Sequence, residues 1–496
     1  MSITAEPLDA AVETTEGGEG LARPRSSLFR AVWRWHFYAG LLSIPIIVLL
    51  CLTGIVYLFK PQLNSLLYGQ MLNVTPQGQT VTYQQQLDAV ERAYPSGAVA
   101  GIATPHTAQR STQFDLTTEA GQTLSVFVNP YTGQVLGQRD NGKDPANIAL
   151  ALHGSLMTGS WLGSANWGDH LIEIVAGWSL VLVVTGVYLW WPRGRQRRSL
   201  RGVLVPRLGL RGRRIPWRDV HAITGVMFSF VTVFFLITGM AWTGFWGPKL
   251  QQAATKLGAS YPPGTWDGAT SKTVGELLPN GQSPWAMGPL PVAASGQPAG
   301  HRHTDGALRW DPRNGAPLDA IVGRAQQLGF PPGFGITMPE DANGSYTIGL
   351  FPDADPQPNR SAVDERVAYL DQYTAEPLGD YRYAQFGPLG KATDFGISLH
   401  EGREWGLASQ LLALAGALAI LTSAATAIVM WRKRRPTGLG APRKEPDRRL
   451  RAGVLMITAA LGALFPLLGL SVVAVLAFDF LVVQRVPALA RALGAS

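Results

Sequence analysis

The sequence predicts an α-helical integral membrane protein built as a tandem repeat. The repeated unit is a transmembrane helix, an exported α+β domain and a second transmembrane helix, and an extra hydrophobic helix or hairpin follows at the C-terminus. Only 15% of the 496 residues are charged and 46% are hydrophobic, which is too apolar for a soluble chain of this length. Several apolar runs reach the roughly 20 residues that a helix needs to cross a bilayer. Motifs of the first half also recur, in the same order, in the second half.

Four apolar runs qualify as membrane-spanning helices, and they lie near residues 37–59, 171–191, 222–246 and 407–431. A fifth apolar region, 452–484, is longer than one untilted span and is interrupted by Pro466 and Gly469. Arg485 and Arg491 follow it and favour a cytoplasmic C-terminus, which requires two short crossings of this region. Five or six crossings are therefore predicted in total.

The repeat is visible both in the spans and between them. Four residues of the first span recur 185 positions later: His36, Gly40, Thr53 and Gly54 become His221, Gly225, Thr238 and Gly239. The segments "VFVNPYTGQVLG" (126–137) and "AYLDQYTAEPLG" (368–379) each enter and leave a polar turn with apolar alternation, which predicts a β-hairpin. "ALHGSL" (151–156) and "SLHEGR" (398–403) precede the second span of each half. Two such halves are expected to pack about a pseudo-twofold axis normal to the membrane.

These observations divide the chain into successive elements. The first half is predicted as a disordered cytoplasmic tail (1–27), a first transmembrane helix (28–60), an exported domain (61–150), and a Leu-His segment with the second transmembrane helix (151–192). After a basic cytoplasmic loop (193–218), the second half has a third transmembrane helix (219–247), an exported domain (248–397), and a Leu-His segment with the fourth transmembrane helix (398–432). A second basic cytoplasmic loop (433–451), the C-terminal transmembrane region (452–484) and a tail (485–496) complete the chain.

The distribution of basic residues predicts the orientation. Residues 193–218 hold ten Arg and no acidic residue, and residues 432–451 hold nine Lys or Arg against Glu445 and Asp447. Such segments stay on the cytoplasmic side, so the amino terminus is predicted to be cytoplasmic and both long segments to lie outside. Because these arginines adjoin membrane spans, the net charge of +8 indicates contact with anionic lipid headgroups, and nucleic acid is not an expected partner.

Histidines are the candidate functional residues. His36 and His221 are predicted at the cytoplasmic ends of the first and third spans, and His153 and His400 at the outer ends of the second and fourth spans. An ionisable group at membrane depth is costly and therefore indicates a functional site, although a histidine at a helix end is also a common interfacial anchor. The repeat symmetry predicts that His36 faces His221 and that His153 faces His400. His170 opens the second span without a counterpart and is the reserve candidate at the outer site.

Two facing imidazoles are the axial ligand set of a low-spin haem. Gly40 and Gly225, four residues after His36 and His221, would leave room for a flat macrocycle or serve helix packing. No CxxCH motif occurs and Cys51 is the only cysteine, so the predicted cofactors are two non-covalent b-type haems, one near each membrane face. Zinc or non-haem iron is the rival reading, but two ligands per site without a repeated carboxylate disfavour it.

Five further segments of the sequence are informative together: "WHFYAGLLSIPIIVLLCLTGIVYLFKP", "VNPYTGQVLG", "ALHGSLMTG", "GVYLWWP" and "ISLHEG". Through these segments the chain resembles the PepSY-associated transmembrane family of bacterial inner-membrane proteins, over roughly residues 28–435. The second exported domain departs from the family pattern, since "YTAEPLG" replaces the usual glycine turn and a Pro/Gly-rich stretch is inserted at 257–300. Some members reduce ferric siderophores with b-type haem in iron acquisition. The resemblance therefore implies a ferric-siderophore reductase with its large PepSY-like domains in the periplasm.

The predicted function is haem-dependent electron transfer across the inner membrane to a ferric siderophore, of the hydroxamate type, followed by release of the iron. No Rossmann or flavin-binding motif occurs in a strand-to-helix context, so a membrane quinol or a cytoplasmic reductant is the expected electron donor. The alternative is a cofactor-free membrane protein whose PepSY-like domains bind an envelope partner or regulate a protease. A transporter would need polar residues in mid-membrane, and the spans have few. The sequence leaves open which siderophore is used, which donor feeds it, whether His170 replaces His153 or His400, and the oligomeric state.

Overall fold

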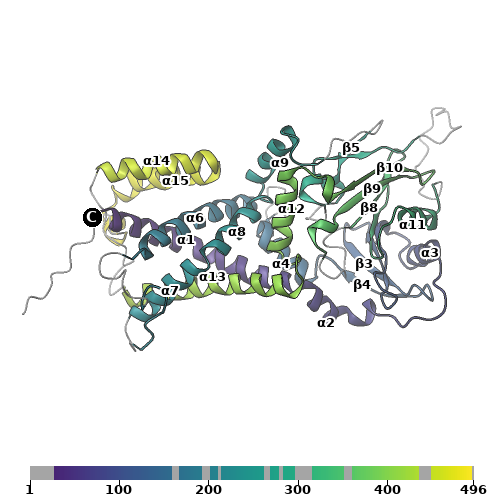
Figure 1. Cartoon of the computed structure of the whole chain (residues 1–496), viewed down its shortest axis with the longest axis horizontal. Helices are drawn as coiled ribbons and strands as arrows, with labels where there is room; N and C mark the ends of the chain where they lie inside the picture. The colour runs from purple at the N-terminus through teal and green to yellow at the C-terminus, as the bar shows by residue number, and fades with distance from the viewer. Residues whose placement is uncertain are drawn as a thin grey trace, which may run out of the picture.

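The computed structural model describes residues 27–158, 167–192, 201–209, 214–261, 269–278, 283–296, 315–350, 360–434 and 448–493. The molecule is elongated, with a helix bundle at one end and a sheet domain at the other (Figure 1). We call the end of the bundle that adjoins the sheet domain the sheet end, and the opposite end the far end.

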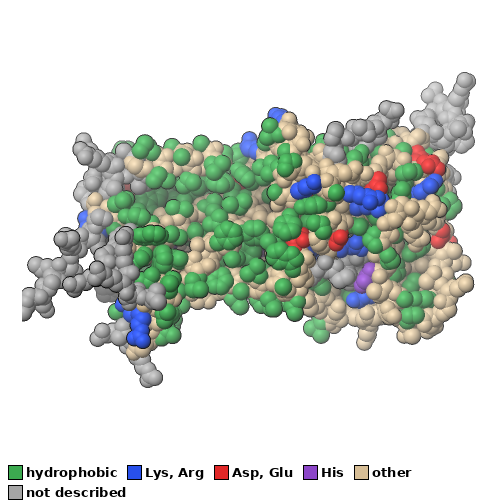
Figure 2. Space-filling model, in the orientation of Figure 1, with side chains coloured by type: hydrophobic (Ala, Val, Ile, Leu, Met, Phe, Trp, Pro, Cys, Tyr) green, Lys and Arg blue, Asp and Glu red, His purple; other side chains and the backbone are tan. Residues whose placement is uncertain are grey.

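Long apolar helices make up the bundle: α1 (Ser27–Leu58), α6 (Trp167–Trp190), the pair α7 (Ile215–Met227) and α8 (Ser229–Met240), and α13 (Leu407–Arg434). α1 packs along α6 and α13, and α13 packs along α7. By length and composition four described helical segments can cross a membrane: α1, α6, α13 and the C-terminal segment Pro466–Val483. The number is five if the α7–α8 pair is counted as one span. Apolar side chains cover the face of the bundle that Figure 2 shows, as in a protein embedded in lipid.

The third predicted span, 219–247, is broken. α7 ends at Met227, α8 begins at Ser229, and the two helices are bent by 57°. The Ser229 hydroxyl donates a hydrogen bond to the Val226 carbonyl at 2.7 Å. A hydroxyl that bonds back to the preceding turn competes with the main-chain ladder and bends helices, which gives a local reason for the break.

The C-terminal region forms a helical hairpin beside the bundle. α14 (Arg448–Leu464) and α15 (Pro466–Phe478) pack on each other, and the turn between them is at Phe465. Gly462 and Gly469 allow the two backbones to touch, since a Cβ on Gly462 would lie 2.8 Å from the Gly469 Cα. α15 also packs on α6, and a π-helical turn (Asp479–Val483) and α16 (Pro487–Ala492) follow.

Two short helices stand between the sheet domain and the bundle (Figure 1). α4 (Pro145–Ser155) begins where Asp144 caps it by accepting a hydrogen bond from the Asn147 backbone N–H. α12 (Pro388–His400) also begins with a proline, whose missing N–H costs nothing at the first helical position. α4 packs against α1, and α12 packs against α8. The two Leu-His motifs therefore lie on helices of their own that precede the second and fourth spans.

The two long segments between the spans share one sheet. The first contributes α2 (Lys60–Leu72), α3 (Tyr83–Ala93), β1 (Ala98–Ala103), β2 (Thr112–Thr117), β3 (Thr123–Val128) and β4 (Val135–Asp140). The second contributes α11 (Leu318–Gln327), β7 (Gly335–Thr337), β8 (Ser345–Gly349), β9 (Arg366–Asp371) and β10 (Pro377–Arg382). The antiparallel order is β10-β9-β8-β7-β1-β2-β3-β4, so the halves meet where β1 pairs with β7 and Ile102 faces Ile336.

The core of the sheet domain draws on both halves. Side chains of α3 and α11 pack with strand residues from both halves in a single buried cluster that includes Val90, Phe114, Ile321 and Ile348. The two segments are therefore one folding unit with an internal twofold pattern. The sequence anticipated two domains, because hydrophobic patterning does not reveal that β1 and β7 pair across the repeat.

Both predicted hairpins are confirmed, as β3–β4 and β9–β10. The turns match in detail: the Tyr131 hydroxyl donates to the Ala108 carbonyl at 2.8 Å, and the Tyr373 hydroxyl donates to the Ala342 carbonyl at 2.9 Å. Gly133 has φ +72°, and its counterpart Ala375 keeps the same left-handed conformation with φ +59°. The turn geometry therefore survives the replacement of glycine, at the strain that a left-handed alanine carries.

The part of the second segment that precedes α11, which includes the insertion at 257–300, covers the other face of β9 and β10. It contains α9 (Trp246–Lys256), β5 (Ala269–Thr273), α10 (Val274–Leu277), the 3-10 helix η2 (Trp285–Met287) and β6 (Pro291–Ala293). Tyr369 and Tyr381 of the sheet pack there with Trp285 and with Ile397 of α12. Two further 3-10 turns, η4 (Ala362–Asp364) and η5 (Tyr383–Gln385), flank β9 and β10. The insertion thus ties α12 to the sheet.

Candidate functional site: two histidine pairs

The structure brings the repeated histidines together as two pairs. His36 of α1 faces His221 of α7 with ring centroids 6.2 Å apart and ring planes at 81°. We call these two residues the far pair. His153 of α4 faces His400 of α12 with ring centroids 6.4 Å apart and ring planes at 90°. We call these two residues the near pair, because α4 and α12 adjoin the sheet domain.

In each pair the Nδ1 atoms are held by the neighbouring helix. In the near pair, His153 Nδ1 lies 2.9 Å from the Leu50 carbonyl and 3.2 Å from the Thr53 hydroxyl, and His400 Nδ1 lies 2.8 Å from the Thr238 hydroxyl. The far pair repeats the arrangement. His36 Nδ1 lies 2.9 Å from the Thr185 hydroxyl, and His221 Nδ1 lies 3.0 Å from the Ser423 carbonyl and 3.5 Å from the Thr426 hydroxyl.

These contacts fix the tautomer of every ring. A carbonyl oxygen only accepts, so His153 and His221 must carry a proton on Nδ1. The threonine hydroxyls already donate to carbonyls of their own helices, at 2.7 Å from Thr238 to Phe234 and at 2.6 Å from Thr185 to Val181. They therefore also accept from Nδ1–H. Each Nε2 keeps its lone pair and, within the described part of the chain, has no hydrogen bond.

The spacing of the rings fits a metal held between them. Two metal–imidazole bonds of about 2 Å, with about 1 Å from each nitrogen to its ring centre, give a centroid separation of about 6 Å. The observed separations are 6.2 and 6.4 Å. Hydrogen bonding of the second ring nitrogen is also what orients metal-binding histidines in general. The donor set and the geometry therefore fit a haem iron with one imidazole on each face.

Glycines let the histidines approach the neighbouring helices. A Cβ on Gly54 would lie 3.2 Å from the His153 ring, one on Gly186 would lie 3.3 Å from the His36 ring, and one on Gly239 would lie 3.6 Å from the His400 ring. Gly40 and Gly225 do not have this role, since a Cβ there would first meet Leu182 at 3.7 Å and Ser423 at 3.9 Å. The glycines that border the rings are those that follow the threonines.

This Thr-Gly unit is the feature that sequence reasoning missed. Thr53-Gly54 and Thr238-Gly239 were recognised as repeated, but no role followed from the repeat alone. The signal was a third copy in the second span, Thr185-Gly186, and a related Thr426-Ala427 in the fourth. One threonine in each of the four spans, each hydrogen-bonded to a different histidine, would have predicted the contacts.

The two pairs lie at different depths. Thr53, which contacts the near pair, and His36 of the far pair are 17 residues apart on α1 (53 − 36 = 17). At a rise of 1.5 Å per residue they are separated by about 25 Å along the helix. Burial lowers the pKa of His153, and burial together with the neighbouring His153 lowers the pKa of His400 to about 3. Both near rings are thus neutral, as metal ligands must be.

The other described histidines, His106 and His170, belong to neither pair. His170 is on the first turn of α6, where a Cβ on Gly244 would lie 3.6 Å from its ring. Glu173, one turn further along α6, accepts backbone hydrogen bonds from Phe245 and Trp246 at the start of α9. His106 is in the sheet domain, where burial and the nearby Arg110 lower its pKa. The "HRHTD" segment (301–305) lies outside the described residues.

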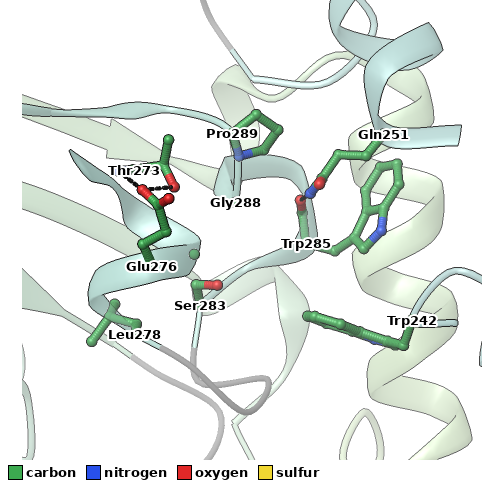
Figure 3. A pocket seen from close by; sticks show the side chains of 10 residues that line it. Trp242, Gln251, Thr273, Glu276, Leu278, Ser283, Trp285, Gly288 and Pro289 are labelled. Carbon is green, nitrogen blue, oxygen red and sulfur yellow. Dashed lines mark hydrogen bonds between the residues drawn. The ribbon is translucent and has the colours of Figure 1, made fainter. Parts of the chain in front are cut away.

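A pocket of about 300 Å³ lies beside η2 (Figure 3). The indoles of Trp242 and Trp285 border one side of it, and Glu276 and Ser283 border the other. Trp242 is 44% exposed, whereas Trp285 is buried and accepts a hydrogen bond from Gln251 on its carbonyl at 2.6 Å. Trp242 follows α8, so the pocket opens at the sheet end of the bundle.

The fold and the paired imidazoles define the class: a membrane-embedded helix bundle that carries two histidine pairs under a fused antiparallel sheet domain. Residues 33–434 match the family described as the PepSY-associated TM region, and the chain belongs to that family. No curated protein matches the chain.

Proposed function

We propose that this protein is an inner-membrane oxidoreductase that binds two b-type haems and passes electrons across the bilayer to a ferric siderophore. The observation that carries the proposal is the shared arrangement of four histidines from both halves: each has its Nδ1 held by a neighbouring helix, and the rings lie in pairs with centroids about 6 Å apart. A cofactor-free protein gives no reason for this arrangement. Tetrahedral zinc takes four protein ligands in structural sites, and each pair offers two.

The charge distribution supports the orientation that this function needs. Arg432, Lys433 and Arg434 end α13 at the far end, and Asp219 of α7 forms ion pairs there with Arg207 and Arg218 at 2.7 Å. Basic residues next to spans favour the cytoplasmic side. In the proposal the far pair therefore lies near the cytoplasm, and the near pair and the sheet domain face the periplasm.

The proposed electron path has two stations. His36 with His221, and His153 with His400, would each hold a haem, and the bound haem would supply one-electron transfer. The protein holds both imidazoles of each pair in the neutral tautomer through threonine and carbonyl acceptors, so that neither ring needs to lose a proton for ligation. The levels of the two pairs, about 25 Å apart along α1, divide a membrane crossing of about 30 Å.

Each ferric ion takes one electron, and the electrons come from a membrane quinol or a cytoplasmic reductant. Ferrous iron binds the hard oxygen ligands of a hydroxamate chelator more weakly, so reduction releases the metal. The sheet end offers the acceptor the pocket with Trp242 and Glu276. The proposal that iron is the substrate is based on the resemblance to ferric-siderophore reductases. The proposal of electron transfer is based on the histidine pairs.

The first test is the absorbance of the full chain, purified after expression with ample haem. We expect a Soret band, α and β bands that sharpen on reduction, and two haems per chain. Replacing His36 or His221 by Ala should remove one haem, and replacing His153 or His400 should remove the other. His170→Ala and His106→Ala are matched controls that keep both. A colourless preparation, or two haems retained in His400→Ala, would refute the assignment.

The second test concerns the acceptor. Protein in liposomes that enclose a reductant should reduce ferric hydroxamate chelates outside, detected with a ferrous-specific trap. Loss of the activity in both His36→Ala and His400→Ala would show that electrons pass both pairs. Equal reduction by these variants and the unaltered protein would argue against the path.

A further inference from the structure

Two buried carboxyl groups lie on the same side of the molecule as the near pair. Asp394 is in the middle of α12, six residues before His400 (400 − 394 = 6), which is about 9 Å along the helix axis. Glu365 directly follows η4, and η4 packs against α12. The two side chains come from different elements, and they are 2% and 4% exposed.

Their hydrogen bonding is unequal. Asp394 accepts backbone hydrogen bonds from Trp285 at 2.7 Å and from Ala286 at 3.2 Å, one on each carboxylate oxygen. Glu365 has no such support, because its buried Oε2 has no hydrogen-bond partner in the described structure. The hydroxyl of Ser398, one turn after Asp394 on α12, is also fully buried and without a partner there. An unsatisfied carboxylate oxygen at this depth is costly, and a bound proton reduces that cost.

The charges around the pair do not neutralise it. Arg403, the cation that acts on both carboxyl groups, forms an ion pair with Glu401 at 2.6 Å. Glu404 accepts hydrogen bonds from the Ser361 hydroxyl and the Ala362 N–H of the adjoining turn. The other titratable groups that face the pair or its turn are Tyr383 of η5, Asp364 of η4 and Arg360. Arg403 therefore acts on the buried pair while it is already paired with Glu401.

Two like charges so placed cannot both be ionised without a large cost. Burial, and then the charge of Asp394, raises the pKa of Glu365 well above its usual range. Burial raises the pKa of Asp394 to about 7, although the two backbone N–H groups and Arg403 act in the opposite direction. Both shifts favour protonation: at neutral pH Glu365 is held protonated, whereas Asp394, whose pKa lies near neutrality, can take up or release a proton.

We propose that Glu365 and Asp394 form a proton-binding site coupled to the near pair. Reduction of a haem held by the near pair would be balanced by uptake of one proton at this site from the periplasmic side, and oxidation of that haem by the acceptor would release the proton again. Charge is thereby conserved locally, and one proton balances one electron. Ser398 extends the site by one turn of α12 toward His400. The coupling rests on the proposed function, whereas the proton-binding site itself does not.

The coupling is tested by redox titration of the full chain in nanodiscs between pH 5.5 and 8.5. The potential of the near haem should fall with rising pH, by up to about 59 mV for each tenfold change in proton activity if one proton accompanies one electron. Glu365→Gln keeps the size of the side chain and removes its proton equilibrium, so the slope should fall by at least half. Glu376→Gln, at an exposed ion pair with Arg324, is the matched control and should keep the slope. Equal slopes in all three proteins would overturn the coupling.

A second measurement separates this inference from the proposed function. Infrared spectra at neutral pH should show a protonated-carboxyl C=O band that Glu365→Gln or Asp394→Asn removes and Glu376→Gln keeps, whether or not haem is bound. If the chain binds no haem, the coupling falls with the proposed function, and the band alone decides whether the site holds a proton. Absence of a band sensitive to these two substitutions would overturn the site.

Discussion

The hydroxyl of Thr238 provides the sharpest test of how the near pair is oriented. Thr238 is the acceptor for His400 Nδ1–H, at 2.8 Å. Its counterpart Thr53 contacts His153 at 3.2 Å, but His153 also has the Leu50 carbonyl at 2.9 Å. Replacing each threonine by valine keeps the branched shape and removes only the hydroxyl. The two substitutions therefore differ in whether the histidine keeps an acceptor.

The magnitude follows from that difference. Losing the acceptor of one buried N–H costs about 1–3 kcal/mol, because the donor is left unsatisfied. At 1.4 kcal/mol per factor of ten, Thr238→Val should weaken haem binding at the near pair by about tenfold or somewhat more. Thr53→Val, which leaves the shorter bond to Leu50 intact, should weaken it by less than about threefold.

The assay is titration of haem into haem-depleted protein in nanodiscs, followed in the Soret band. A His153→Ala protein, which should bind haem at the far pair alone, gives the signal of the far site. Subtracting that signal leaves the binding curve of the near site. The far haem should bind equally in both valine variants and in the unaltered protein. Equal weakening by Thr53→Val and Thr238→Val would refute the reasoning, since it would mean that the carbonyl of Leu50 does not hold His153. No weakening by either would show that Nδ1 contacts do not orient the ring.

Three further predictions address the packing, the seam and the pocket. Gly54→Ala places a methyl group 3.2 Å from the His153 ring and should displace the near haem, whereas Gly225→Ala, with its nearest neighbour at 3.9 Å, should leave both haems unchanged in the absorbance spectrum. Ile336→Ala, at the buried seam between β1 and β7, should lower the free energy of unfolding by about 2–4 kcal/mol in denaturant titrations and release the near haem before the far one. Trp242→Ala should raise KM for a ferric chelate without changing the haem spectrum if the acceptor docks in the pocket beside η2, and an unchanged KM would exclude docking there.

Much of the helical part could be predicted from the sequence, because a membrane span is recognisable as a run of about 20 apolar residues. The apolar runs near 37–59, 171–191 and 407–431 correspond to α1, α6 and α13. The bend between α7 and α8 was not predicted, since the apolar run near 222–246 continues through it and only Ser229, whose hydroxyl bonds back to Val226, marks the place. The sequence placed the Leu-His motifs just before the second and fourth spans, but it did not show that each motif lies on a short helix of its own.

The pairing of histidines was predictable for a different reason. A duplicated unit with a pseudo-twofold axis makes equivalent positions of the two halves face each other, so His36 with His221 and His153 with His400 followed from spacing. Glu365 and Asp394 could not be found in that way. They have no repeat partners, and their burial arises from packing between η4 and α12 that no local pattern encodes.

The fused sheet explains how separate halves can hold the near rings at a fixed spacing. β4 and β10 are the two outermost strands of the eight-stranded sheet, and each is followed within a few residues by a short histidine-bearing helix, α4 or α12. The pairing of β1 with β7 joins these two edges in one sheet. In the bundle, α1 packs against α4 and α8 packs against α12. A 6.4 Å ring separation is therefore set by the whole sheet together with two helix contacts. In the described part of the chain, His36 and His221 of the far pair lie on α1 and α7 and contact residues of α6 and α13, away from the sheet. A change where β1 pairs with β7 should therefore act on the near pair first.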